Sequence, residues 1–420
     1  MEHITSGYIH PCSLFHVMCY VLMSKEKFLI TLTVLIDVIG IGVVIPVLPF
    51  YVARFDSSPL AVTALIAVFA FCSFISAPFL GAWSDRIGRR PILIISILST
   101  AVGWLVFASA WSLTLLFIGR IIDGLAAGNF STAQSYLTDI AKNEKERTAN
   151  LGVVGATFGI GLIVGPAIGG FLGAWNHTLP FWFVGFLALI NAALVYLFLP
   201  ESKIVREKKS ISLNPLRPLY RAFSDRKLLP GFGAWFLFGI AVAVGQSVFA
   251  LYLGRAFGFK ELAVGSLTTA LGVVVALNQG VALKHFWLRR FSTRQLESGL
   301  MLTLALAWLI MGGQILWLFM VGLAIQTLTH SILRVTLTSH LSILGGPTRQ
   351  GEILGILTSV MSLSMIIGPI LAGALFKINL GWPYFLAAFC CFLCWLLIFR
   401  NQRRESQVNL PEDILIDPAA

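Results

Sequence analysis

The sequence has few charged residues. Only 12% of its 420 residues are Asp, Glu, Lys or Arg, while 57% are hydrophobic. A soluble domain carries about twice that charged fraction. Apolar segments of membrane-spanning length recur from near residue 28 to residue 399. The low charge content argues against a soluble globular protein, which would need a polar surface, and indicates a multi-pass membrane protein.

Cysteine is also sparse, and the six cysteines form no disulfide framework. Cys391 and Cys394 have the C-x-x-C spacing, but no second ligand pair is near them in sequence. We interpret them as small hydrophobic residues of a membrane helix. The sequence shows no nucleophile–base pair, no cluster of metal ligands and no nucleotide-binding loop. It therefore predicts a protein that is not an enzyme and that uses no metal and no cofactor.

The net charge of +11 lies in short loops between apolar segments. This distribution is typical of membrane topology and does not form a nucleic-acid surface. Of the 30 Lys and Arg residues, 24 fall on the side of the N-terminus, 4 on the opposite side and 2 within predicted helices. We therefore predict a multi-pass protein of the inner (cytoplasmic) membrane with both termini in the cytoplasm and no nucleic-acid partner.

Each apolar segment is expected to be helical, because lipid cannot satisfy exposed backbone groups. The predicted fold class is an all-α membrane protein with twelve transmembrane helices in two pseudo-symmetric six-helix bundles. The approximate bounds of the helices are 28–52, 60–83, 91–110, 113–140, 148–173, 179–199, 230–254, 261–283, 295–312, 314–343, 351–377 and 382–399.

A basic polar stretch divides the chain into two halves. The predicted units are an N-terminal extension, a six-helix bundle, a basic cytoplasmic linker, a second six-helix bundle and a cytoplasmic tail, at residues 1–24, 25–199, 200–229, 230–399 and 400–420. Residues 1–24 are either an extension, or translation starts at Met23 and residues 1–22 lie upstream of it.

The two halves repeat at an offset of 203 residues. This offset superposes small residues and prolines, carrying Gly152 onto Gly355, Gly165 onto Gly368, Pro166 onto Pro369 and Gly170 onto Gly373. An internal duplication of six-helix units is typical of transporters in which two halves rock around a central site.

A charged turn joins the second and third predicted helices, at residues 81–91. Its polar and small residues are Gly81, Asp85, Arg86, Gly88, Arg89 and Arg90. We expect Gly81 to let a neighbouring helix approach closely and Gly88 to allow a tight turn with positive φ. Asp85 is expected to cap a short turn and to pair with Arg89.

Three ionisable residues lie inside the first and fourth predicted helices. A carboxylate such as Asp37 is costly within an apolar helix and is a functional candidate by default. We expect Asp37 to bind and release a proton. The alternative is that Asp37 lies near the helix end and its side chain extends into water on the cytoplasmic side. Arg120 keeps its charge and needs a partner, with Asp123 and Asp37 as the two candidates.

The fifth predicted helix carries glycines spaced by four residues around a proline. The set is Gly161, Gly165, Pro166, Gly169 and Gly170. Such spacing allows close helix packing, and the proline introduces a kink.

These motifs resemble those of the major facilitator superfamily over about residues 25–400. The turn at 81–91 matches its signature G-x-x-x-D-R-x-G-R-R-P, and the Gly161–Gly170 segment matches its antiporter signature. The helix around Asp37 resembles that of the tetracycline-efflux-like drug:proton antiporters. The resemblance implies that Asp85 and Arg89 join Asp139 in a conformational latch of the outward-facing state. It also implies proton coupling at Arg120.

The sequence therefore predicts a secondary active transporter that is a monomer in the bilayer and exports small amphipathic or drug-like compounds in exchange for protons. A proton-coupled importer of a nutrient or siderophore is the first alternative, and a non-transporting sensor or scaffold the second. Glu297 is expected at the interface beside Arg294. The candidate cavity residues are Asn129, Gln134, Gln246, Gln279, His330 and Arg334.

Overall fold

The structure, a computed structural model, describes residues 24–125, 127–202, 220–221, 224, 228–346 and 349–407. The described residues form helices and no strand, which confirms the predicted all-α fold. The predicted N-terminal extension, most of the basic linker and the end of the predicted tail lie outside the described residues.

The first half contains six membrane-length units. The fourth predicted helix, 113–140, is interrupted at Ala127 and Gly128 and is therefore two helices, α5 and α6. In chain order the helices are α2 (Lys25–Val52), α3 (Pro59–Ile87), α4 (Arg89–Ala108), α5 (Leu113–Leu125), α6 (Asn129–Asp139), α7 (Glu144–Trp175) and α8 (Leu179–Phe198).

The second half repeats this arrangement. The predicted helix at 261–283 continues to Arg290, because a π-helical segment, η1, carries it further. The elements are α10 (Leu229–Phe257), α11 (Glu261–Leu277), η1 (Asn278–Trp287), α12 (Leu288–Arg290), α13 (Thr293–Met311), α14 (Leu316–Leu344), α15 (Gln350–Ile378) and α16 (Trp382–Gln407).

Eleven spans in the described part of the chain are long and apolar enough to cross a membrane. Each agrees in position with one of the twelve predicted spans. The remaining predicted span corresponds to α13, whose first two turns carry the polar residues Arg294, Gln295 and Glu297. These polar residues reduce its apolar length, while the rest of α13 packs against α14 and α16.

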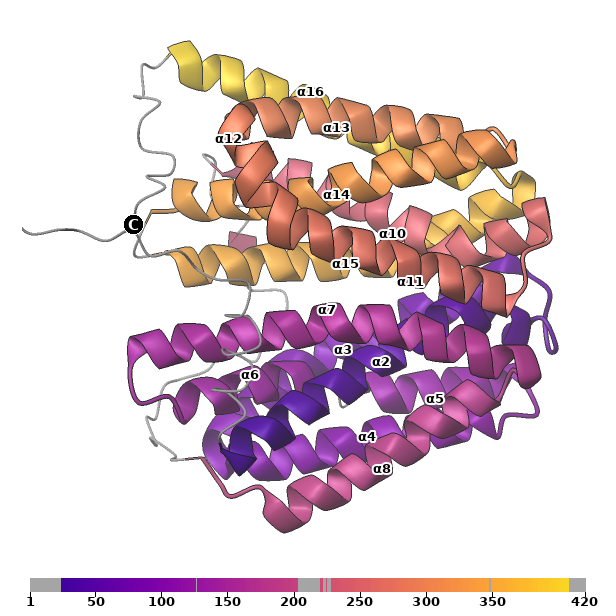
Figure 1. Cartoon of the computed structure of the whole chain (residues 1–420), viewed down its shortest axis with the longest axis vertical. Helices are drawn as coiled ribbons and strands as arrows, with labels where there is room; N and C mark the ends of the chain where they lie inside the picture. Colours follow the sequence, from indigo (N-terminus) through magenta and orange to yellow (C-terminus); the bar gives the residue numbers. More distant parts are fainter. Residues whose placement is uncertain are drawn as a thin grey trace, which may run out of the picture.

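The helices of the two halves lie in two separate groups (Figure 1), the first half below and the second half above in that view. The turns alternate between two ends of the molecule. We call the end with Gly88, Asn143, Ser202 and Ser292 the loop end and the end with Ser58 and Lys260 the far end. One apolar core runs through the second half into the far-end part of the first, and a smaller core fills the loop-end part of the first half.

The two halves touch closely near the far end. A Cβ added to Gly170 of α7 would lie 2.9 Å from Cα of Gly265 in α11. A Cβ added to Gly373 of α15 would lie 3.0 Å from Cα of Leu60 in α3. Gly170 and Gly373 are equivalent positions of the internal repeat, 203 residues apart, so the same position in each half forms the contact.

The helices separate toward the loop end. Gly152 lies eighteen residues before Gly170, and Gly355 lies eighteen residues before Gly373. Eighteen residues make five helical turns, so each pair shares one face of its helix. A Cβ added to Gly152 or Gly355 would meet no atom within 4 Å. In this conformation the halves are therefore closed at the far end and apart at the loop end.

Candidate functional site

The turn at 81–91 is shorter than the sequence predicted. Helix α3 continues to Ile87 and α4 begins at Arg89, so Gly88 alone connects them. Gly88 has φ of +119°, a conformation that favours glycine. The prediction that Gly81 admits a neighbouring helix is wrong for this conformation, because a Cβ there would meet no atom within 4 Å.

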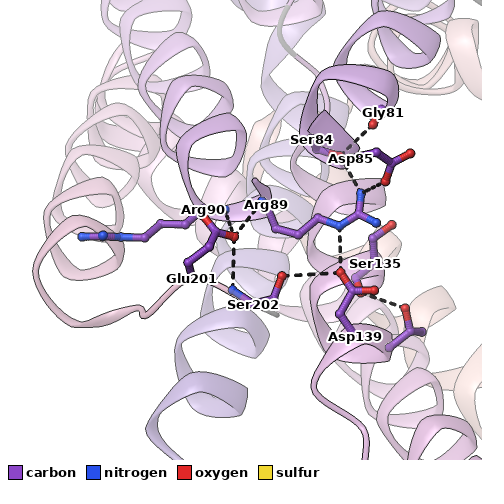
Figure 2. A network of polar contacts seen from close by, with 10 residues as sticks. Gly81, Ser84, Asp85, Arg89, Arg90, Ser135, Asp139, Glu201 and Ser202 are labelled. Atoms are coloured by element: carbon purple, nitrogen blue, oxygen red, sulfur yellow. Dashed lines mark hydrogen bonds and ion pairs between the residues drawn. The ribbon is translucent and has the colours of Figure 1, made fainter. Parts of the chain in front are cut away.

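Arg89 is the centre of a charge network in this corner (Figure 2). Its guanidinium lies 2.5 Å from Oδ1 of Asp85 and 2.9 Å from Oδ2 of Asp139. It also donates to Oγ of Ser84 at 2.6 Å. The network joins the end of α3, the start of α4 and the end of α6. Arg86, in contrast, is exposed.

Glu201 completes the network, and no pattern in the sequence indicated its role. Its Oε1 accepts hydrogen bonds from the backbone amides of Arg89 at 2.8 Å, Arg90 at 3.2 Å and Ser202 at 3.1 Å. A carboxylate at a helix N-terminus satisfies free amides and interacts favourably with the helix dipole. The side chain of Arg90 donates to the carbonyl of Tyr196 at the end of α8. The start of the linker is thus fastened to the α3–α4 corner.

We expect Gly88→Ala to lower stability by about 1–3 kcal/mol, the cost of holding a residue in a disfavoured backbone region. The added Cβ would also lie 2.5 Å from Oε2 of Glu201. Gly81→Ala is the matched control, since its Cβ meets no atom within 4 Å inside a helix. That control should be neutral or stabilising by up to about 1 kcal/mol. Thermal unfolding of the purified protein measures both, and equal midpoints would contradict the assignment.

Asp37 lies in the middle part of α2 and is half-buried. Its Oδ1 accepts a hydrogen bond from Nδ2 of Asn129 at 2.8 Å. Asn129 is nearly fully buried, and its amide also reaches Thr100 of α4 at 3.3 Å. Asn129 begins α6, directly after the break at Gly128. The sequence predicted that Asn129 lines the cavity. In the structure Asn129 instead links Asp37 of α2 to the start of α6.

Arg120 and Asp123 form the second buried polar group of the first half. Each is 6% exposed, and their side chains lie 3.3 Å apart. The sequence left two candidate partners for Arg120, Asp123 and Asp37. In the structure Asp123 is the partner, while Asp37 accepts a hydrogen bond from Asn129 instead. The guanidinium carbon also lies 4.5 Å from the ring centre of Phe69 and 5.1 Å from that of Trp104. Aromatic faces favour a cation in such positions.

The glycines of α7 pack against α2 beside Asp37. A Cβ on Gly161 would lie 2.7 Å from Cβ of Val38, and one on Gly165 would lie 2.8 Å from Cα of Gly42. Gly169 meets the backbone of Val43 in the same way. The interval of four residues places these glycines on one face of α7. Gly170, the next residue, faces α11 of the other half.

A cavity of about 720 Å³ lies between the halves, lined mainly by α3, α14 and α15. Arg334 of α14 is in its wall, together with Ser73, Phe74, Trp235 and Met361.

The other five predicted cavity residues are not among the described residues that line it. Gln279 donates to the carbonyl of Ser331 at 3.0 Å, and the His330 ring stacks on Phe238. Gln134 is half-buried and Gln246 is exposed. Asn129 is held by Asp37, as described above.

A buried acid–base pair in the second half escaped the sequence analysis. The carboxylate of Glu297 in α13 lies 2.8 Å from Nδ1 of His340 in α14, and Glu297 is 1% exposed. Glu297 lies near the start of α13, where the sequence predicts it, and α14 covers its side chain. Within the described residues, no three His, Cys, Asp or Glu side chains are grouped to hold a metal ion.

Comparisons with known proteins identify a family and several relatives. A model of the Major Facilitator Superfamily matches residues 30–295 and 249–414. Multidrug resistance protein 2 of Bacillus subtilis (strain 168) is 29% identical over 374 residues, covering 87% of this chain and 92% of that protein. Tetracycline resistance protein, class E, of Escherichia coli is 30% identical over 377 residues, covering 84% and 89%. The crystal structure of the nucleoside transporter NupG aligns with a TM-score of 0.75 at 12% identity, covering 90% of this chain and 100% of that one.

Proposed function

We propose that this chain, which belongs to the Major Facilitator Superfamily, exports small amphipathic compounds in exchange for protons by alternating access. The superfamily consists of transporters and not of enzymes, so a membrane setting and small-molecule substrates follow from membership. The relatives named for multidrug and tetracycline resistance support export over uptake.

We further propose that the protein is a monomer in the inner (cytoplasmic) membrane with both termini in the cytoplasm. The concentration of Lys and Arg on the side of the N-terminus supports this orientation. The loop end then faces the cytoplasm, and the halves 25–199 and 230–399 are the units that rock. With the loop end open, the cavity would accept substrate from the cytoplasm, as an exporter requires.

The hydrogen bond between Asp37 and Asn129 is the observation that carries the coupling mechanism. An ionised Asp37 accepts a charge-assisted hydrogen bond, which is roughly twice as strong as a neutral one. Protonation of Asp37 would therefore weaken the link between α2 and the start of α6. Because α6 begins at a helix break, it can shift relative to α5 without bending a continuous helix. A proton on Asp37 would thus favour a rearrangement of the first half.

Arg120 and Asp123 supply a second step. Protonation of Asp123 would leave the buried charge of Arg120 without its counter-charge, which is costly in an apolar setting. Among the described residues, the contacts with Phe69 and Trp104 would then remain to hold Arg120 in place. We propose that Asp37 and Asp123 carry the transported proton and that Arg120 links their state to the surrounding helices.

The network of Asp85, Arg89 and Asp139 is proposed to act as the conformational latch, with Gly88 and Glu201 shaping its corner. Its described contacts lie within the first half and the start of the linker, and they hold α3, α4 and α6 as one body. They are formed while the loop end is open, so by themselves they do not distinguish the outward-facing state, contrary to the expectation from the resemblance. The latch of that state would require the corner, with Gly81, Arg86 and Arg90, to engage the second half when the loop end closes.

Asp37→Asn tests the coupling. The protein would be placed in liposomes with an imposed pH gradient and an internal pH dye, and a panel of amphipathic compounds would be screened. Asparagine keeps the size of the side chain and an acceptor for Asn129, but it cannot take up the proton. We expect substrate-dependent proton movement to fall to the level of liposomes without protein. Glu144→Gln, which changes an exposed carboxylate at the start of α7, should leave it unchanged.

The direction of proton movement decides the remaining choices. Protons moving opposite to the substrate support export. Protons and substrate moving together would refute the exporter and favour the importer. Unchanged coupling in Asp37→Asn would refute the role of Asp37 and move the proton site to Asp123.

A further inference from the structure

The cavity contains an unneutralised positive charge. Arg334 is exposed and lines the cavity ten residues before the end of α14, about 15 Å from the loop end of that helix. The described residues that line the cavity include no Asp or Glu. Within the described part of the chain, the guanidinium forms no ion pair. Arginine keeps its charge in proteins, so at this depth it needs water or a counter-charge.

The remaining wall offers an apolar surface and hydroxyl groups. Phe74, Trp235 and Met361 contribute apolar area. The hydroxyl of Ser73 is buried in the wall and has no hydrogen-bond partner among the described residues. The volume of about 720 Å³ lies within the usual range for small-molecule pockets. The cavity therefore suits a molecule with an apolar body and one group that accepts hydrogen bonds.

We infer that the cavity selects amphipathic anions, such as aromatic carboxylates or sulfonates, and that Arg334 binds the anionic group. This inference rests on the proposed export function and specifies its substrate class. A planar guanidinium matches a carboxylate or sulfonate with two parallel hydrogen bonds. A cationic compound would be repelled by Arg334 and would find no counter-charge in the described wall. His330, one turn deeper on α14, stacks on Phe238 and adds no negative charge.

An anionic substrate changes the driving force. Exchange of one inward proton for one outward monoanion moves two elementary charges in the same electrical sense. The same exchange with a monocation moves none. An inside-negative potential therefore drives anion export directly, and imposed potentials in liposomes should accelerate it.

The test is a binding measurement on the purified full-length chain in uncharged nanodiscs. Three probes share one fluorophore and differ in charge: dansylglycine is an anion, dansylamide is neutral and dansylcadaverine is a cation. We expect dansylglycine to bind tighter than either of the others by about tenfold or more. Arg334→Gln should abolish this preference and Arg334→Glu should reverse it. Arg289→Gln, which removes an exposed arginine of α12, should leave it intact.

Each other outcome overturns the inference. Equal binding of the three probes, tighter binding of the cation or no saturable binding of the anion would show that the cavity does not select anions. An anion preference that persists in Arg334→Gln would show that Arg334 is not its cause. Because binding at equilibrium needs no pH gradient, its result is independent of the direction of transport. Proton movement driven by dansylglycine in liposomes would test export separately.

Discussion

Replacement of Gly170 by leucine is expected to stop transport by keeping the far end open. A Cβ at this position would lie 2.8 Å from the carbonyl oxygen of Glu261 and 2.9 Å from Cα of Gly265. Both are backbone atoms and cannot turn aside, so the added side chain would push α7 and α11 apart. Overpacking of this kind costs about 1–3 kcal/mol or more, which shifts a two-state equilibrium by roughly tenfold to a hundredfold.

Distances between spin labels at Ser57 and Lys260, on opposite halves of the far end, would measure the effect. We expect Gly170→Leu to move the distance distribution to longer values and transport to fall to background. Gly152→Leu is the matched control, since it lies on the same face of α7 in open space. It should leave the far end closed and instead obstruct closure of the loop end. An unchanged far-end distance in Gly170→Leu would contradict this account.

Loss of the imidazole in His340→Leu is expected to destabilise the second half by about 3–5 kcal/mol, because removal of one partner leaves a buried charge uncompensated. Glu297 is 1% exposed and lies 2.8 Å from Nδ1 of His340. The double variant Glu297→Leu with His340→Leu should recover most of the loss, since a buried pair replaced by apolar residues is often neutral. Denaturant unfolding of the purified protein gives the free energies.

His285→Leu serves as the control for this pair. His285 is exposed near the loop end, and its ring contacts only the carbonyl of Val281 among the described hydrogen bonds. We expect a change within about 0.5 kcal/mol there. A double variant as unstable as His340→Leu would refute the pairing and indicate that each side chain is needed for packing.

The helices could be predicted from the sequence, and the interruptions in them could not. Lipid forces each apolar segment into a helix, so the positions of the spans follow from composition alone. The break between α5 and α6 depends on tertiary contact. A Cβ at Gly128 would lie 2.9 Å from Leu80, and one at Gly124 would lie 2.7 Å from Cβ of Cys72. The π segment at Asn278 has a similar setting, because Asn278 donates to Ser331 of α14 at 2.7 Å.

The candidate site divides in the same way. Asp37, Arg120 and Asp123 could be identified because a charge inside an apolar helix is rare. Their partners could not all be assigned, since Asn129 is 92 residues from Asp37. Glu201 was missed because it meets its three amide donors only when the start of the linker lies against the first turn of α4. No local pattern carries such information.

The contact that closes the far end has a consequence for the energy needed to open it. At Gly170 the halves meet through backbone against backbone, while Gly373 meets the backbone of Leu60 and the side chain of Thr63. One apolar core continues from the second half into the far-end part of the first, so parting the halves exposes apolar side chains, and the free energy of burial that is lost scales with their area. One proton crossing a potential of 100 mV supplies about 2.3 kcal/mol. At about 25 cal/mol per Å² of apolar area, that energy offsets the exposure of only roughly 90 Å², so we expect the far end to open only together with closure of the loop end, which buries apolar area in exchange.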